Sequence, residues 1–288
     1  MRDGKIDAQN NLIYLHIPKT AGTTVRSIFA RQFPKNALCK VPNVIPMETF
    51  LALSPEQKRQ YRCFFGHMVF GLHEHLAGSS IYISMLRNPV DRIISDYYHA
   101  KRNKEHGRYE QINANNWSLA DYARFRAEEQ GIANTETRFI SGQFGLTAGA
   151  PFDPMPASAL DTAKENIRTR FKAVGLQEQF DTSLILFKQV MGWKNVNYVR
   201  KNVGRNRPKN EAEPKETIQL IERLNALDME LYAHVEKLFN SQVDAQRDYF
   251  EREARKIQRG QQWYQLAYMG YQRLPKSAQN LAQKLFGN

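Results

Sequence analysis

Cysteine, long hydrophobic runs and low-complexity tracts are scarce in this sequence of 288 residues. Its two cysteines, Cys39 and Cys63, cannot build a disulfide framework and lack the spacing of a metal site, so a reducing, cytoplasmic compartment is predicted. No stretch reaches the roughly 20 apolar residues that cross a bilayer. Residues 1–11 are polar and lack the apolar core of a signal peptide. Modest glycine and proline contents exclude a fibrous or disordered chain.

Acidic residues are also in deficit. The 41 Lys and Arg residues outnumber the 29 Asp and Glu residues, which gives a net charge of +12. Such a basic chain is predicted to bind something anionic: nucleic acid, a phosphorylated small molecule, an acidic polymer or a membrane surface. The excess is uneven, because residues 211–240 are net acidic, whereas residues 194–209 contain several cations and no acidic residue.

Short apolar segments alternate with amphipathic helical patterns along residues 1–240. This alternation predicts an α/β fold in which a parallel sheet is flanked by helices. One domain is expected over residues 1–240, followed by a helical extension over residues 241–288. The expected strands span residues 12–17, 63–65, 81–86, 172–176 and 196–200, and the clearest expected helices span residues 179–191 and 213–239.

The first chemical signal is the segment LHIPKTAGTT at residues 15–24, which follows the first expected strand. A strand-to-helix turn presents free backbone N–H groups and the positive end of a helix dipole. Gly22 allows close backbone approach, Lys19 adds a full charge, and hydroxyl donors come from Thr20, Thr23 and Thr24. These features favour a phosphate cradle over an ordinary turn with a surface lysine, although the Walker A order GxxxxGK[ST] is absent.

The second signal is the segment ISMLRNPVDR at residues 83–92, with Ser95 shortly after it. Arg87 ends an expected strand and therefore lies at the carboxyl edge, where α/β sheets bind ligands. Arginine with a nearby hydroxyl suits a terminal phosphate, which a guanidinium can bind with two hydrogen bonds. The alternative is that Arg87 pairs with a carboxylate and Ser95 is a solvated hydroxyl.

Together the two segments resemble the sulfotransferases that use 3′-phosphoadenosine-5′-phosphosulfate (PAPS). The sequence is most similar to the branch that contains heparan sulfate 2-O-sulfotransferase and its bacterial relatives. HIPKTAGTT at residues 16–24 is similar to the 5′-phosphosulfate loop of that family, and LRNPVDR at residues 86–92 with Ser95 is similar to its 3′-phosphate motif. The resemblance covers most of residues 12–240 and is specific in these two loops.

The resemblance implies a P-loop-like nucleotide-binding fold and the transfer of a sulfuryl group from PAPS, which leaves 3′-phosphoadenosine-5′-phosphate and requires no metal. Arg87 and Ser95 would hold the 3′-phosphate. Arg200 and Lys201 resemble a late basic loop that closes over the cofactor. The 5′-phosphosulfate would be held by Lys19, Thr20, Ala21, Gly22, Thr23 and Thr24.

Two catalytic roles remain, a group that stabilises the leaving oxygen and a base. Lys19 suits the first role, and a histidine suits the second because its pKa lies near working pH. His67 follows a short expected strand, and Gly66-His67 resembles the Gly-His of the 2-O-sulfotransferase branch. The segment His73-Glu74-His75 is the fallback, and His16 is expected to pack at a strand end.

The acceptor is predicted to be a saccharide hydroxyl by family likeness, while a protein tyrosine, a lipid or a small alcohol stays open. The basic residues 194–209 could favour an acidic glycan. Residues 143–156 could form a substrate lid or a surface connection, and Trp117 could stack on a sugar or lie buried.

Two other classes of protein compete with this interpretation. A P-loop small-molecule kinase would need Mg²⁺ and a Gly-Lys-Ser/Thr order that the chain lacks. A non-enzymatic binder of an anionic polymer or membrane would explain the net charge but not the two anion loops one βα unit apart, and no nucleic-acid partner is predicted. The basic, aromatic residues 261–288 could contact a membrane surface, pack on the same chain or join a second subunit of a homo-oligomer.

Overall fold

The computed structural model describes residues 10–41, 45–129, 131–143, 155–198, 213–273 and 275–277. Within these residues, one five-stranded sheet has the order β2-β3-β1-β4-β5, and every pairing is parallel. The predicted parallel sheet is thus confirmed, and β2 is an edge strand that the sequence pattern did not indicate. The strands are β1 (Asn11–Leu15), β2 (Leu38–Lys40), β3 (Cys63–Gly66), β4 (Ser80–Leu86) and β5 (Phe171–Leu176).

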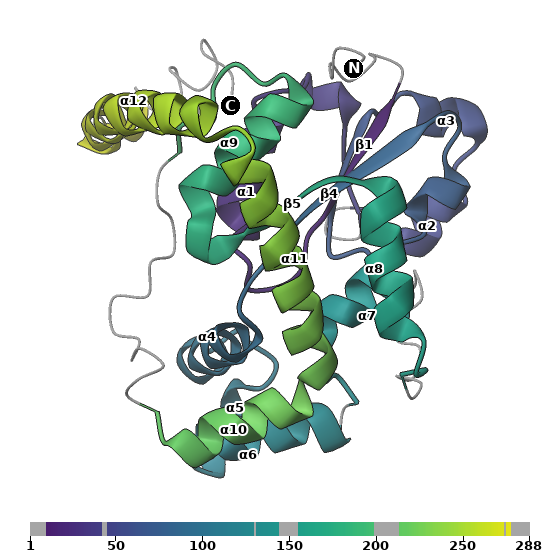
Figure 1. The fold of residues 1–288 in the computed structure, drawn as a ribbon, viewed down its shortest axis with the longest axis vertical. Coiled ribbons are helices and arrows are strands. Elements are labelled where there is room, and N and C mark those ends of the chain that lie inside the picture. The colour runs from purple at the N-terminus through teal and green to yellow at the C-terminus, as the bar shows by residue number, and fades with distance from the viewer. Residues whose placement is uncertain are drawn as a thin grey trace.

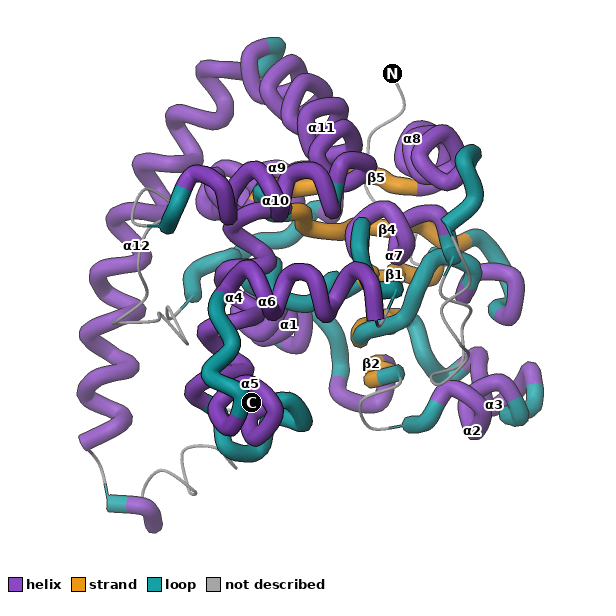
Figure 2. The backbone as a smooth tube through the Cα atoms, turned by 90° about the horizontal axis from the view of Figure 1, so that it is seen from below, coloured by secondary structure: helices purple, strands orange, loops and turns teal. Residues whose placement is uncertain are grey.

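Helices cover both faces of the sheet, as parallel strands require. In Figures 1 and 2, α1 and α9 lie on one face and α8 lies on the other. Single helical turns occur at Lys35–Ala37, Leu72–His75, Gln177–Gln179 and Phe125–Glu129. The longer helices are α1 (Gly22–Ala30), α2 (Met47–Leu51), α3 (Pro55–Arg59), α4 (Pro89–Arg102), α5 (Tyr109–Ala114), α6 (Leu119–Arg124), α7 (Thr135–Ser141), α8 (Ala159–Arg170), α9 (Phe180–Met191), α10 (Lys215–Leu224), α11 (Ala226–Asp244) and α12 (Arg247–Arg273).

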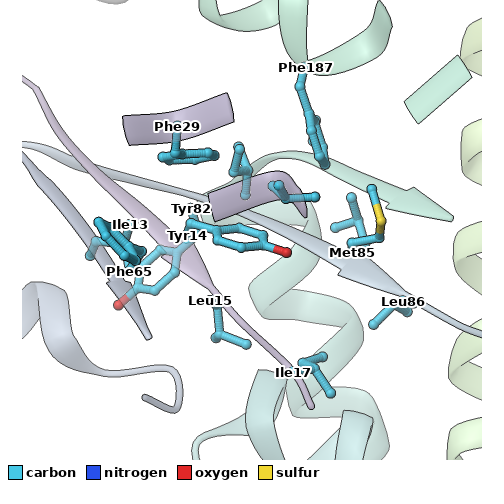
Figure 3. Close-up of a cluster of buried hydrophobic side chains, with 14 of the residues drawn as sticks. Ile13, Tyr14, Leu15, Ile17, Phe29, Phe65, Tyr82, Met85, Leu86 and Phe187 are labelled. Carbon is cyan, nitrogen blue, oxygen red and sulfur yellow. The ribbon is translucent and has the colours of Figure 1, made fainter. Parts of the chain in front are cut away.

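The main core lies around β1, whose five residues are all buried. A strand in the middle of a helix-covered sheet is enclosed on both faces, which explains its near-continuous apolar sequence. Figure 3 shows Tyr14 and Phe65 from the strands beside Phe29 of α1 and Phe187 of α9. This core fixes the ends of β1, β3 and β4 relative to one another.

A second, smaller core joins α4, α5, α6 and α10, which form a separate group of helices in Figure 1. The group is attached to the sheet through α4, which begins immediately after β4. Asn88 caps α4 by accepting hydrogen bonds from the amides of Val90 and Asp91, and Pro89 occupies the first turn.

Two expectations about secondary structure were wrong. Residues 196–198, the described part of the strand expected at 196–200, form no strand. The helix expected over residues 213–239 is divided at Asn225 into α10 and α11. The side chain of Asn225 accepts a hydrogen bond from the amide of Asn134, and Asn134 accepts one from the amide of Asp228. Local periodicity does not encode this tertiary contact, which engages the Asp228 amide, while the Asn225 amide still donates to the carbonyl oxygen of Ile221.

The C-terminal region of the described chain is helical, as predicted. Helix α11 continues past residue 240 to Asp244, and Phe250 and Ile257 of α12 pack into the main core. The division into residues 1–240 and 241–288 stays a prediction. Among the described helices, none combines the length and the apolar character needed to cross a membrane.

Candidate active site

The three segments that the sequence identified as candidate site segments directly follow three neighbouring strands of the sheet. Strand β1 pairs with β3 on one side and with β4 on the other. Because all three strands are parallel, His67 after β3, the turn with Lys19 after β1 and Arg87 after β4 follow one another along the same edge of the sheet. The chain leaves β1 and β4 towards opposite sides, which makes their junction the switch point where such sheets bind ligands.

The turn between β1 and α1 has an unusual backbone. Lys19 and Ala21 have positive φ angles of 73° and 62°, a region that residues other than glycine seldom adopt. Thr20 between them is fully buried, and its hydroxyl donates a hydrogen bond of 2.8 Å to the carbonyl oxygen of Ile17. The Thr20 hydroxyl therefore stabilises the turn, and its predicted role as a phosphate donor stays a prediction. Turns of this kind gather N–H groups into an anion-binding concavity at the start of a helix.

Gly22 makes room for a histidine ring. A Cβ atom at this position would lie 1.6 Å from Nε2 of His16. The sequence interpretation assigned Gly22 to close approach of a ligand, whereas the structure assigns the space of its missing side chain to His16. That ring also stacks on His67, with ring centroids 4.3 Å apart. Burial, followed by the charges of His67 and Arg26, lowers the pKa of His16 to about 3, so His16 stays neutral.

We expect Gly22→Ala to destabilise the protein by about 1–3 kcal/mol, the usual cost of forcing extra atoms into a packed site. The added methyl group must displace the His16 ring, since the Cβ–Nε2 separation of 1.6 Å is far inside van der Waals contact. Urea unfolding measures the change. Gly107→Ala is the control, because a Cβ atom there meets nothing within 4 Å. Equal stability of both variants would show that His16 moves freely.

Arg87 connects the second motif to the first. Its guanidinium donates a hydrogen bond of 3.1 Å to the carbonyl oxygen of Lys19 and lies 3.9 Å from the carboxylate of Asp91. Asp91 and Ser95 lie four residues apart on α4, which places both on one side of that helix. The alternative that Arg87 pairs with a carboxylate is therefore realised in part, and Arg87 also contacts the lysine turn.

Two carboxyl groups hold the backbone at the end of β4. Glu136 of α7 accepts a hydrogen bond of 2.9 Å from the amide of Arg87, and Glu178 accepts one of 2.9 Å from the amide of Asn88. These amides are thus engaged within the protein, which leaves the side chains of the motif to contact a phosphate. No periodicity marks Glu136 or Glu178 in the sequence, so neither residue was predicted from the motifs.

We expect Glu136→Gln to become more stable than the parent as pH rises. Burial, with the nearby Asp228 carboxylate, raises the pKa of Glu136 well above its ordinary 4.5. The folded chain then keeps a proton that the unfolded chain has lost, so rising pH destabilises the parent above about pH 4.5. Glutamine removes this cost and keeps an oxygen for the Arg87 amide. Urea unfolding at pH 5 and pH 8 measures the difference, and a pH-independent difference would contradict a protonated Glu136.

His67 is held in one tautomer. Its Nδ1 atom lies 3.0 Å from the carbonyl oxygen of His16, and a carbonyl only accepts, so Nδ1 carries the proton. In the neutral ring, the lone pair is therefore on Nε2. Burial of the ring and the charge of Arg26 lower the pKa of His67, against the opposing effect of its hydrogen bond to His16. The side chain nonetheless reaches the surface, so Nε2 belongs to a neutral, accessible imidazole.

The fallback histidine lies elsewhere. His73 forms a hydrogen bond of 3.0 Å with the hydroxyl of Tyr82, beside Phe171 at the amino end of β5. Tyr82 stands four residues before the end of β4, about 13 Å at the usual rise of a strand. The described geometry thus separates His73 from the edge that carries Lys19 and Arg87 and favours His67.

Lys19 lies beside α4. Burial opposes ionisation of Asp96, but the charges of Arg126, Arg92 and Lys19, together with a hydrogen bond from Tyr122, lower its pKa. Burial and then Lys19 also lower the pKa of His99, one turn further along α4. The charge of Lys19 thus acts on α4 at both the buried Asp96 and the exposed His99.

Several residues predicted to contact a ligand have no assigned position here or no contact that tests their role. Arg200 and Lys201, with most of the basic segment 194–209 and most of the possible lid at 143–156, lie outside the described residues. Their predicted roles, like those of Thr23, Thr24 and Ser95 towards a ligand, stay predictions. Trp117 is half-buried and packs against Phe125 with ring centroids 4.7 Å apart, which accords with the packing alternative.

Fold and site define an α/β protein in which a lysine turn at a helix N-terminus and a neutral histidine lie at one edge of a parallel sheet. A model of the galactose-3-O-sulfotransferase family matches residues 3–285. The chain therefore belongs to this family, and the prediction of a sulfotransferase is confirmed.

Individual relatives are about 25% identical to the chain over the aligned residues. Heparan-sulfate 6-O-sulfotransferase 2 of Gallus gallus is 26% identical, over 88% of this chain and 73% of the relative. Galactose-3-O-sulfotransferase 2 of Sus scrofa is 25% identical, over 80% and 61%, and human galactosylceramide sulfotransferase is 26% identical, over 84% and 60%. The chain thus spans about three fifths of the latter two. The predicted 2-O branch is not confirmed.

Among solved structures, mouse sulfotransferase SULT7A1 complexed with PAP matches 79% of this chain and 69% of its own, at 12% identity and a TM-score of 0.33.

Proposed function

We propose that the chain transfers a sulfuryl group from PAPS to a saccharide hydroxyl, with His67 as the general base. The observation that carries the proposal is the order of His67, Lys19 and Arg87 on three neighbouring strands. This order supports an anion site at the Lys19 turn, because a neutral imidazole lies on one side of the turn and an arginine on the other.

The residues present fit PAPS. The turn with left-handed Lys19 and Ala21 supplies amides, a helix N-terminus and an ammonium group for the 5′ end of the nucleotide. Arg87 and Ser95 on the β4 side are placed for its 3′-phosphate. When bound, PAPS supplies a sulfuryl group on a phosphate that leaves readily.

The chain contributes charge and proton transfer to the reaction. Lys19 stabilises the negative charge that grows on the leaving 5′-phosphate oxygen. His67 takes the proton of the acceptor hydroxyl at Nε2, while the bond from the acceptor oxygen to sulfur forms and the bond from sulfur to the leaving oxygen breaks. The His16 carbonyl stabilises the protonated ring through Nδ1–H, so the same hydrogen bond sets the tautomer and supports the charged form.

The position of the acceptor follows from the order of the residues along the carboxyl edge of the sheet. With the nucleotide over β1 and β4, the space beside His67 over β3 is left for the acceptor. The names of the relatives supply the candidates: galactose 3-hydroxyls, heparan sulfate 6-hydroxyls and galactosylceramide. All are saccharide hydroxyls, which supports that class without choosing a member.

Radiolabelled PAPS tests the proposal directly. The purified chain is incubated with it and with β-galactosides, galactosylceramide, heparan sulfate, tyrosine peptides and small alcohols. We expect label in a saccharide, and a rise in melting temperature with 3′,5′-adenosine bisphosphate that exceeds the rise with ATP. Label only in peptides or alcohols would overturn the acceptor class. A shift with ATP alone, without any transfer, would favour the kinase.

A further inference from the structure

Helix α12 lies at the outer edge of the molecule in both orthogonal views (Figures 1 and 2). Its outward face exposes three of the four large apolar side chains that are exposed among the described residues. Trp263 is 76% exposed, Leu266 57% and Met269 48%. They follow one another at intervals of three residues, so they form one stripe on the helix surface. We call Trp263, Leu266 and Met269 the apolar stripe.

The opposite face of α12 is fixed to the rest of the chain. Ile257 packs into the main core, and Tyr264 accepts a hydrogen bond from Arg31 at the end of α1. Gln261 accepts a hydrogen bond of 3.1 Å from the amide of Tyr198. Because these contacts hold the helix from one side, α12 cannot turn the apolar stripe inward without breaking them.

The charges around the stripe have one sign. The sequence contains no acidic residue after Glu253, whereas it contains Arg255, Lys256, Arg259, Arg273, Lys276 and Lys284. On a helical projection, Arg259 and Arg273 fall within the same outward face as Trp263 and Leu266. An indole and aliphatic side chains flanked by cations suit the boundary between acyl chains and anionic headgroups.

We propose that the outward face of α12 docks on an anionic lipid surface. The apolar stripe enters the headgroup and acyl boundary, and Arg259 and Arg273 contact the lipid phosphates. A second copy of the chain fits the same face less well, because a two-fold contact brings the same cations together and the stripe has no acidic neighbour to meet them. This docking goes beyond the proposed reaction and does not depend on it.

Vesicle binding by the full chain tests the proposal. We expect cosedimentation with phosphatidylcholine vesicles that contain phosphatidylglycerol, and little with phosphatidylcholine alone. The Trp263→Gln/Leu266→Gln variant should lose at least ten-fold in affinity, and each of Arg259→Gln and Arg273→Gln about five-fold, from the usual contribution of a cation near such a surface. Leu238→Gln is the matched control, since Leu238 is 42% exposed on α11.

Tryptophan fluorescence supplies an independent readout. Trp193 is only 7% exposed and Trp117 is half-buried, so a blue shift on adding vesicles reports mainly Trp263. Trp263→Phe should remove the shift and keep most of the binding. Failure of the parent to bind phosphatidylglycerol vesicles, or equal binding by the double variant, would overturn the proposal. The proposal would also be overturned if the parent formed a dimer in light scattering and bound no vesicles, and if the Trp263→Gln/Leu266→Gln variant lost that dimer.

Discussion

His67→Ala is expected to lose about 10²–10⁴-fold in the rate of sulfuryl transfer, the usual contribution of a general base, and to keep its affinity for 3′,5′-adenosine bisphosphate. Rate and nucleotide affinity should separate because different strands carry the residues concerned. His67 follows β3, whereas the residues proposed to bind the nucleotide follow β1 and β4. Single-turnover rates and nucleotide titrations measure the two quantities. His75→Ala, at an exposed position in the fallback segment, is the control and should keep its activity. Full activity of His67→Ala would end its assignment as the base.

The pH profile gives a second test of the same residue. His67 acts as a base only when neutral, so activity should be present at high pH and fall as pH drops through the pKa of the ring. Because burial lowers that pKa below 6.5, the acid limb should have its midpoint below pH 6.5. His67→Ala should lack this limb. A midpoint above 6.5 in the parent would indicate a different titrating group or a rise in the pKa of His67 when the nucleotide binds.

Lys19→Met should lose about 10²–10³-fold in transfer rate, the usual effect of removing one group that stabilises a developing oxyanion. Unlike the His67 variant, it should also weaken nucleotide binding, because the ammonium group meets charge already present on the bound phosphate. Methionine keeps a long unbranched side chain at φ 73°, so the left-handed backbone is strained equally in both proteins.

Two controls distinguish loss of the Lys19 charge at the site from a change in net charge or in stability. Lys104→Met removes one positive charge at an exposed site and should leave both rate and affinity unchanged. Urea unfolding of Lys19→Met should match the parent, since the carbonyl of Lys19 still accepts the hydrogen bond from Arg87. Transfer and nucleotide affinity equal to those of the parent would show that the turn after β1 is not the phosphosulfate site.

Local patterns predicted the sheet and the two sequence motifs because each of these features depends on a few consecutive residues. Near-continuous apolar runs mark β1 and β4, Asn88-Pro89 marks the start of α4, and the lysine turn lies between a strand and a helix. The division at Asn225 could not be predicted in this way, since Asn225 bonds to Asn134, 91 residues away. The strand expected at residues 196–200 had only apolar content to support it.

Residue types alone identified a lysine turn, an arginine motif and a set of candidate histidines. The partners and surroundings of these groups are visible only in the folded chain. Folding places His73 away from the edge that carries Lys19 and sets the His67 tautomer through a carbonyl 51 residues away. It also directed the Thr20 hydroxyl inward and filled the space above Gly22 with His16. The physical reason is that residue types are local, whereas proton positions and free hydrogen-bonding groups depend on partners that only folding brings together.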